Sequence, residues 1–260
     1  MSGNPFHEPI DAVDAAPATT DVAGTRFNLI KVLSVLGVLG AIPIFLLLPS
    51  TRSRPATGRT LCLNNVKNIT LALHSYAAEY ETLPPAYTVD SEGNPLHSWR
   101  TLILPYLDQQ QLYETIDFAK PWDDPVNAAA GREMHRVYRC ASADIPAGYT
   151  TYLANASPNG CFHAIEPRDT SAVMDGTSNT LMVIEVSPDQ AVHWMKPQDD
   201  DGQFFLNFCG STALPHAGGI VAGFADGSVR FLAAETTQEE RRAMISTAGS
   251  DSAAADPLEQ

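Results

Sequence analysis

Three tryptophans beside polar partners, and a histidine that precedes an aspartate, are the residues whose types could do chemistry. A tryptophan ring can stack on a ligand while a neighbouring charged or imidazole group orients it, which is typical of sugar and solute sites. A glutamate within an apolar strand could form the floor of such a pocket. The candidate ligand-binding residues are Trp99, Arg100, Trp122, Asp123, Glu185, His193, Trp194, His216 and Asp226.

These residues also have a plainer structural interpretation. The tryptophans could fill the core of a small domain. Asp226 begins an Asp-Gly pair, which hairpin turns favour for conformational reasons alone. If Glu185 faces the core it needs a charged partner, and Arg100 or Lys196 could supply it. Ligand binding and structure therefore both stay open.

No nucleophile and base can be paired at the level of a motif. The sequence has no Gly-x-Ser-x-Gly elbow, no phosphate-binding loop and no His-Glu-x-x-His run. His216 and Asp226 invite a catalytic interpretation, but a turn position is enough to explain the aspartate. We therefore expect no catalytic residue and no enzyme activity, and a hydrolase is the least favoured function.

Two oxygen-rich clusters leave calcium as the one cofactor that the sequence suggests. One consists of Asp123, Asp124 and Asn127, and the other is the aspartate run 199–201. Neither has the spacing of an EF-hand, and acidic loops are more often simply solvated. Apart from this calcium, we expect no cofactor and no metal.

The cysteines indicate the redox environment. Cys62, Cys140, Cys161 and Cys209 show no Cys-x-x-Cys spacing, which argues against zinc and thioredoxin-type chemistry. An even count suits two disulfides in an oxidising compartment, and four cysteines allow three pairings. We favour Cys62–Cys140 with Cys161–Cys209.

The chain that carries these side chains is organised around an apolar run over residues 32–48. It carries no charge and lies between Lys31 and Arg52. About 20 such residues cross the roughly 30 Å hydrocarbon layer of a bilayer. A core helix would show a polar stripe, and a secretory signal would begin with a basic region rather than an acidic leader. We therefore predict a retained transmembrane helix over 27–50.

The rest of the chain divides around this helix. Charge leaves its orientation open, because bases flank both ends and slightly favour a cytoplasmic head, whereas the cysteines favour an external one. The net charge of −14 argues against nucleic acid, whose phosphates attract Lys and Arg. The expected segments are a disordered leader over 1–25, a linker over 51–59, an extracytoplasmic head over 60–247 and a disordered tail over 248–260.

Periodicity predicts one long helix followed by a β-rich half. Apolar residues at steps of three and four indicate a helix over 61–80. Alternation and turn residues then predict short strands over 137–140, 150–154 and 180–186, a hairpin over 220–232, and a last helix capped by Thr237 and Glu240.

Many ordered motifs together resemble a known family. They include Arg59–Asn65, Leu83–Ala86, Leu104–Leu107, Pro121–Asn127, Tyr138–Cys140, Asp175–Thr180, and His216 nine residues before Asp226-Gly227. They resemble the planctomycete family of prepilin-like proteins called domain of unknown function 1559, over about residues 27–248. The start of the apolar helix, Phe27–Ile30, is similar to that of pilins and pseudopilins.

The resemblance implies an α+β, pilin-like fold, with an N-terminal transmembrane helix and a spine helix packed on a small, mostly antiparallel β-sheet. It also implies an inner-membrane anchor with the N-terminus inside and the head in the periplasm. The chain departs from the pilin pattern, because Arg26 replaces the expected Gly before Phe27 and Lys31 replaces the expected Glu. We therefore expect a permanent monomeric anchor rather than a polymer.

Two functions lead. The first is a membrane-anchored, pseudopilin-like extracytoplasmic protein that acts as a non-catalytic scaffold or surface component. The second is an extracytoplasmic solute- or carbohydrate-binding protein, because the family has been grouped with bacterial solute-binding proteins. The expected partners are the membrane, membrane proteins and a small molecule or sugar, but no nucleic acid. A pocket lined by two or more tryptophans would favour binding, and tryptophans buried against the long helix would favour the scaffold.

Overall fold

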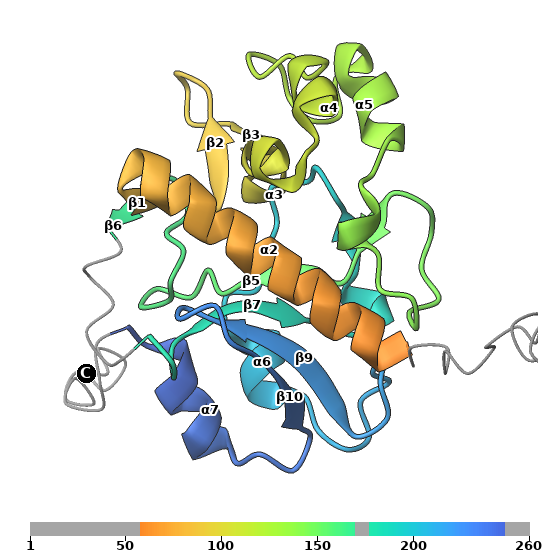
Figure 1. Cartoon of the computed structure of the whole chain (residues 1–260), viewed down its shortest axis with the longest axis vertical. Helices are drawn as coiled ribbons and strands as arrows, with labels where there is room; N and C mark the ends of the chain where they lie inside the picture. The colour runs from red at the N-terminus through yellow and green to blue at the C-terminus, as the bar shows by residue number, and fades with distance from the viewer. Residues whose placement is uncertain (1–57, 170–176, 248–260) are drawn as a thin grey trace, which may run out of the picture. The chain divides into compact units, whose positions relative to one another are not determined.

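The computed structural model describes residues 58–169 and 177–247. The predicted leader, the transmembrane helix over 27–50 and the tail lie outside these residues. Within the described ranges, no helix combines the length and the apolar character that crossing a bilayer requires. The described residues form helices and small antiparallel sheets, so the α+β class is confirmed (Figure 1).

A four-stranded antiparallel sheet with the order β10-β9-β7-β5 forms the centre of the head (Figure 1). The strands are β5 (Tyr152–Ala154), β7 (Leu181–Glu185), β9 (Gly219–Phe224) and β10 (Val229–Ala233). The predicted hairpin is confirmed as β9 and β10. Its turn holds Gly227 at φ 77°, a left-handed conformation that glycine adopts without strain.

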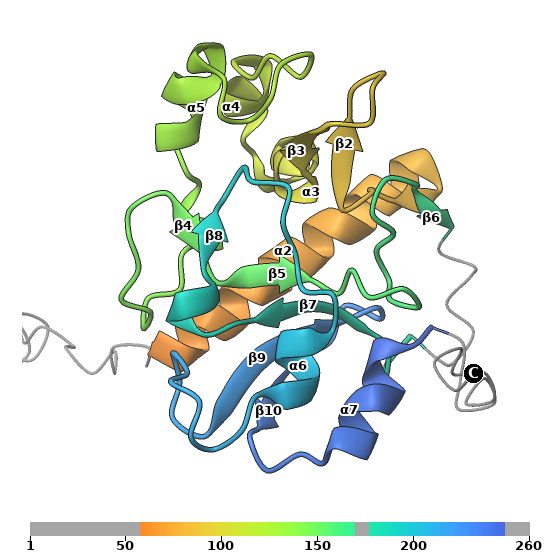
Figure 2. The same ribbon diagram turned by 180° about the vertical axis from the view of Figure 1, so that it is seen from behind.

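Helix α2 (Gly58–Tyr80) lies across one face of this sheet (Figures 1 and 2). Its buried positions include Cys62, Val66, Ile69 and Leu73, which recur at steps of three and four as an amphipathic helix requires. They pack with inward residues of β5, β7 and β9 in the larger apolar cluster. The predicted spine-like helix on an antiparallel sheet is therefore present.

The opposite face of the sheet is covered by α6 (Gln203–Asn207) and α7 (Gln238–Ile245) (Figure 2). Phe205, Ile220, Phe224 and other side chains form a second apolar cluster there. The predicted capping box is confirmed, because Thr237 and Glu240 each accept a backbone N–H of the other. The sheet thus separates two cores.

Short elements fill the segment between α2 and β5, and further short ones follow β5. They are β1 (Thr82–Leu83), β2 (Tyr87–Val89), β3 (Pro95–Ser98), α3 (Trp99–Leu102), η1 (Leu104–Leu107), α4 (Gln110–Glu114), η2 (Pro125–Asn127), α5 (Ala128–Arg132), η3 (Arg136–Tyr138), β4 (Tyr149–Thr150), β6 (Arg168–Asp169), η5 (Pro188–Gln190) and β8 (Val192–His193). Three two-stranded sheets join β1 to β6, β2 to β3 and β4 to β8.

The predicted strand over 137–140 is wrong. Residues Arg136–Tyr138 form a 3-10 turn instead. The apolar side chains that suggested a strand are used for packing: Tyr138 is fully buried and stacks on Trp194, with ring centroids 6.0 Å apart. Burial of an aromatic ring therefore explains the pattern without a strand partner.

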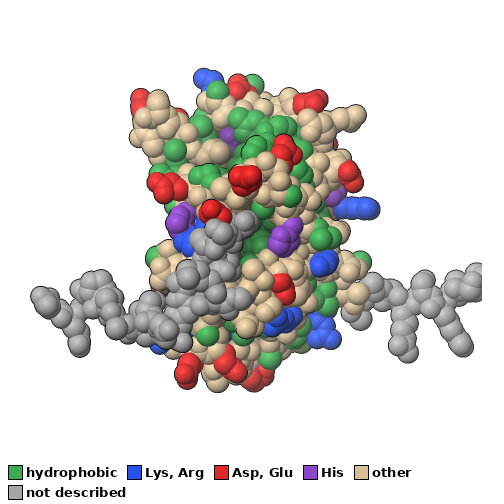
Figure 3. Space-filling model, turned by 60° about the vertical axis from the view of Figure 1, so that its left-hand side comes forward, with side chains coloured by type: hydrophobic (Ala, Val, Ile, Leu, Met, Phe, Trp, Pro, Cys, Tyr) green, Lys and Arg blue, Asp and Glu red, His purple; other side chains and the backbone are tan. Residues whose placement is uncertain are grey.

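The surface mixes charges of both signs. On the face shown in Figure 3, the acidic side chains lie singly among apolar, basic and uncharged ones. The negative charge on this face is therefore dispersed over the described residues rather than gathered in one cluster.

Gly223 in β9 allows α2 to approach the sheet closely. A Cβ atom there would lie 2.6 Å from Thr70 Cγ2 and 2.9 Å from Val66 Cγ1. Gly223→Ala should therefore lower the free energy of unfolding by about 1–3 kcal/mol, since overpacking forces the helix from the sheet. Urea unfolding measures this change. Gly210 has open space around it, so Gly210→Ala should stay within about 0.5 kcal/mol; equal effects of the two substitutions would contradict the tight contact.

Candidate functional site

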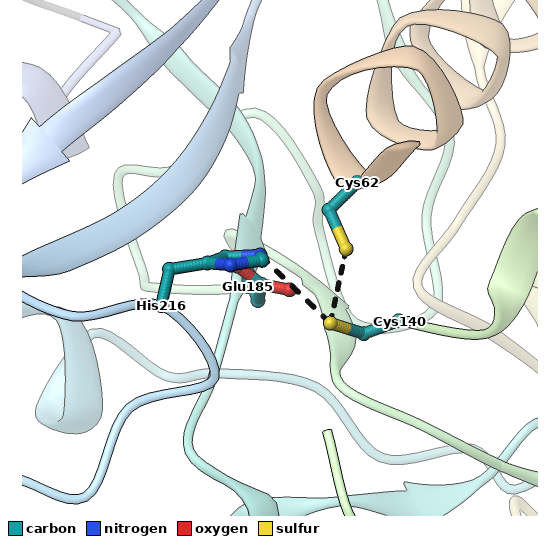
Figure 4. A group of neighbouring side chains, drawn as sticks. All are labelled: Cys62, Cys140, Glu185 and His216. Carbon is teal, nitrogen blue, oxygen red and sulfur yellow. Dashed lines mark hydrogen bonds and ion pairs between the residues drawn. The ribbon is translucent and has the colours of Figure 1, made fainter. Parts of the chain in front are cut away.

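Four side chains of metal-ligand type meet on the α2 side of the sheet (Figure 4). Cys62 comes from α2, Cys140 follows η3, Glu185 ends β7 and His216 precedes β9. All four residues are buried, and their sulfur, oxygen and nitrogen atoms lie within 4.8 Å of one another. This Cys–Cys–Glu–His cluster is the densest gathering of potential ligands that the described residues contain.

Local structure fixes each member of the cluster. Cys62 lies on the buried face of α2, one turn before Val66. Glu185 pairs with Tyr152 of β5 in the antiparallel register, which keeps its side chain on the same side of the sheet as the tyrosine. His216 is held by a β-bridge to Gly219 at the entry to β9. Two members of the cluster therefore lie on α2 and β7, whereas Cys140 and His216 lie in the segments after η3 and before β9.

The contacts within the cluster are close. Cys62 Sγ lies 3.0 Å from Cys140 Sγ, and Cys140 Sγ lies 3.9 Å from His216 Nε2. His216 Nε2 lies 3.3 Å from Glu185 Oε2, which also accepts a hydrogen bond from the Val221 amide at 3.4 Å. Glu185 Oε1 is buried and has no hydrogen-bond partner among the described residues. A buried carboxylate oxygen in this state is destabilising unless something else satisfies it.

Contact and burial shift the pKa values of the cluster. The hydrogen-bonding contact with Cys140 lowers the pKa of Cys62 to about 4 against the effect of burial, and the same contact raises the pKa of Cys140. Burial raises the pKa of Glu185, although its hydrogen bond to His216 opposes this. Burial alone lowers the pKa of His216, but bonds to Cys62 and Glu185 outweigh it and raise the pKa to about 9. The contact thus favours one thiolate within the Cys62–Cys140 pair.

The disulfide prediction is not confirmed, because the structure holds all four cysteines as free thiols. Cys62 and Cys140 are neighbours as expected, but their 3.0 Å separation exceeds the roughly 2.05 Å of an S–S bond. The pairing of Cys161 with Cys209 is not formed. Cys161 is buried in the larger apolar core beneath α2, whereas Cys209 is exposed on the segment that follows α6.

Glu185 does need a buried partner, but the predicted partners are wrong. The partner is His216, whereas the Arg100 guanidinium forms an ion pair with Asp199 Oδ1 at 2.8 Å. Arg100 has no N–H group left for Glu185, since its other N–H groups also have acceptors. They donate to the backbone oxygens of Tyr152, Trp194, Lys196 and Gln198.

Trp99 and Trp194 belong to the core around this arginine. Both are fully buried. Trp99 Nε1 donates to Asp199 Oδ1 at 2.9 Å, and Trp194 Nε1 donates to the Gly131 oxygen at 2.9 Å. Neither ring faces solvent, which favours the interpretation as core residues over a ligand-stacking role.

Trp122 and His193 do come together at the surface. Their rings are in contact at a tilt of 33°, with centroids 4.9 Å apart, and Tyr149 meets the His193 ring edge-on at 6.0 Å. These three rings line a pocket of about 270 Å³. Its polar lining includes Asp189, Gln190, Lys196 and Gln198. We call this the aromatic pocket; one predicted tryptophan lines it rather than two.

His216 and Asp226 are not brought together. Strand β9 lies between them, and its six residues extend about 20 Å. Asp226 is exposed and accepts a hydrogen bond from the Ser228 amide at 2.8 Å within the hairpin turn. Asp123 is also exposed. Asp226 therefore has the structural role that its Asp-Gly context allows.

Several oxygens of the two clusters suggested for calcium are used in structural hydrogen bonds or an ion pair. Asp124 caps η2, and the fully buried Asn127 bonds the preceding loop at Asp117. Asp199 pairs with Arg100, and Asp200 accepts the backbone amides that begin α6. Calcium at these positions stays a prediction.

Sequence reasoning misses two features of these sites. Cys62 and Cys140 are 78 residues apart and Cys140 and His216 are 76 apart, so no short ligand motif could reveal their convergence with Glu185. Tyr149 gives no signal of its own because it lies beside Thr150 in an ordinary two-residue strand.

One comparison with known proteins finds a family match over part of the chain. A family model described as "Protein of unknown function (DUF1559)" matches residues 51–156. This range contains Cys62, Trp122 and Cys140 and ends before Glu185 and His216. No curated protein and no solved structure matches the chain. The family predicted from the sequence motifs is therefore confirmed over this range, and the His216–Asp226 signature lies beyond it.

Arg100→Met should be among the most damaging single substitutions in the described residues. It leaves the buried Asp199 carboxylate without its cation, and breaking a buried pair in this way costs about 3–5 kcal/mol. Chemical denaturation would measure the loss of unfolding free energy. Arg132 is exposed, so Arg132→Met serves as the matched control. A loss no larger than that of the control would rule out a central role for the pair.

Proposed function

We propose that this protein, whose residues 51–156 match the family described as "Protein of unknown function (DUF1559)", is a membrane-anchored, pseudopilin-like scaffold or surface component without catalytic activity. The observation that carries the proposal is α2, a 23-residue helix laid across a four-stranded antiparallel sheet. Such a helix can serve as the spine that joins a head to a membrane span.

The position of α2 in the chain supports the anchor. Only nine residues separate the end of the apolar run 32–48 from Gly58, where α2 begins. An uncharged run of this length suits insertion as a single helix. In this proposal the N-terminus lies on the cytoplasmic side of the inner membrane and the head lies in the periplasm. Its partners are membrane proteins.

The tryptophans also favour a scaffold over a binding protein. Trp99 and Trp194 are fully buried and hydrogen-bonded within the core. They stabilise the head instead of meeting a ligand. A head built in this way offers a rigid surface on a membrane tether.

The anchor predicts how the full-length chain fractionates. Alkaline carbonate should leave it in the membrane pellet, and protease added to spheroplasts should digest the head. A chain with Leu36→Arg and Ile42→Arg should be released, because each central arginine costs about 2.5–3.5 kcal/mol of insertion. Immunoblotting of both fractions measures the outcome. Release of the unmodified chain by carbonate would refute the anchor, and protection of the head from protease would refute its location.

The aromatic pocket supports a second function, binding of a sugar or similar solute. Trp122, Tyr149 and His193 offer ring faces and edges, while Lys196 and Gln198 offer hydrogen-bond donors. The volume of about 270 Å³ suits a ligand near the size of one sugar ring. Membrane anchoring would then hold the ligand beside the bilayer.

This second function predicts a sugar whose binding depends on Trp122. Trp122→Ala should weaken it at least about tenfold, since one aromatic stacking contact contributes on the order of 1.5 kcal/mol, whereas Tyr80→Ala on the exposed end of α2 should not. Calorimetry of the full-length chain across a panel of mono- and disaccharides measures this. No binding across the panel would remove this function.

The same binding should depend on pH. Burial lowers the pKa of His193, and its Nδ1 accepts a hydrogen bond from the Met195 amide at 3.3 Å. The ring is therefore neutral at pH 7, and binding should be constant above that pH. Protonation of His193 removes the Nδ1 acceptor of the Met195 amide and so disturbs a ring that lines the pocket. Binding should therefore weaken as the pH falls below the ordinary histidine pKa of about 6.5. His193→Gln should flatten this profile.

A further inference from the structure

We propose that the Cys–Cys–Glu–His cluster is a transition-metal centre and that Zn²⁺ is the ion its donor atoms suit best (Figure 4). Two sulfurs, one imidazole nitrogen and one carboxylate oxygen converge from Cys62, Cys140, His216 and Glu185. Thiolate and imidazole ligands select zinc over calcium and magnesium, which prefer oxygen alone. Four protein ligands make a closed, structural site.

Two of the distances between the donor atoms are near those of one tetrahedral zinc. With Zn–S bonds of about 2.3 Å and Zn–N and Zn–O bonds of about 2.1 Å, a sulfur and a nitrogen lie about 3.6 Å apart and a nitrogen and an oxygen about 3.4 Å apart. The structure has 3.9 Å from Cys140 Sγ to His216 Nε2 and 3.3 Å from His216 Nε2 to Glu185 Oε2. Small side-chain movements would therefore complete the polyhedron.

The two sulfurs alone do not decide between a metal and a disulfide. At 3.0 Å they would have to separate by about 0.8 Å to bind one tetrahedral zinc. They would have to approach by about 1 Å to form a bond. Cys62 and Cys140 are therefore compatible with either state, and the choice depends on the other two members of the cluster.

Glu185 and His216 favour the metal. A disulfide carries no charge and gives the buried Glu185 carboxylate no cation beyond the imidazole at 3.3 Å. It would also leave Glu185 Oε1 without a partner among the described residues. A divalent ion takes the carboxylate as a ligand and offsets two of the three negative charges of the two thiolates and the carboxylate. The metal thus accounts for all four side chains, whereas a disulfide accounts for two.

A zinc here would join the first turns of α2 to β7, to the entry of β9 and to the segment after η3. These segments are far apart in sequence, so the ion would act as a cross-link within the head. Because metal binding to the folded state adds to stability, removing the ion should destabilise the fold. This role goes beyond the proposed anchor and does not depend on it.

The first test measures metal content and thiol state in the full-length chain, purified in mild detergent without chelator or reductant. We expect about one zinc per chain by elemental mass spectrometry. After denaturation with chelator, Cys62 and Cys140 should both react with an alkylating agent without prior reduction. A Cys62–Cys140 peptide that stays linked until reduced would overturn the proposal in favour of a disulfide, and so would a zinc-free chain that takes up no added Zn²⁺.

The second test separates the ligands from other cysteines and acids. Glu185→Gln keeps the shape of the side chain and should weaken Zn²⁺ binding at least about tenfold, whereas Cys209→Ser, at an exposed cysteine outside the cluster, should not. If Glu185→Gln fails to fold, the unmodified chain decides: its melting temperature should fall on chelation and recover with Zn²⁺ but not with Ca²⁺. Unchanged zinc affinity in Glu185→Gln, or an unchanged melting temperature on zinc removal, would overturn the site.

Discussion

The pairing of Arg100 is the constraint on which much of the described head depends. Its guanidinium is fully buried, so every N–H needs a partner inside the protein. Asp199 supplies the charge, and the remaining N–H groups donate to the backbone oxygens of Tyr152, Trp194, Lys196 and Gln198. Helix α3, strand β5 and the segment after β8 are therefore tied to one side chain and cannot shift independently.

This arrangement also gives the aromatic pocket a firm base. His193 and Trp194 are neighbours in the chain but face different environments: His193 lines the pocket, and Trp194 lies in the core. Trp194 is held by its hydrogen bond to Gly131 and by stacking on Tyr138, and its backbone oxygen accepts a hydrogen bond from Arg100. A ligand stacked on Trp122 would therefore contact His193, whose position is fixed by the core contacts of the neighbouring Trp194.

The features that sequence analysis predicts well are those encoded locally. Helix α2, the hairpin at Gly227 and the capping box at Thr237 follow from periodicity, turn chemistry and side-chain caps within a few residues. The partners of Arg100 and Glu185 could not be predicted, because tertiary packing chose them across long stretches of chain. The same packing buried two tryptophans and turned 136–138 into a 3-10 turn. The confirmed family match covers 51–156 and leaves the His216 region to physical argument.

The close packing of α2 against the sheet has a mechanical consequence. Any pull on the preceding segment would reach the described head at Gly58 and be transmitted along a helix whose inner face is buried between Cys62 and Leu73. Thr70 and Val66 sit against Gly223, so the helix cannot slide without collision against the strand. A force along α2 would act on many of its contacts with the sheet at the same time, instead of breaking them one after another. This makes α2 suited to bearing tension.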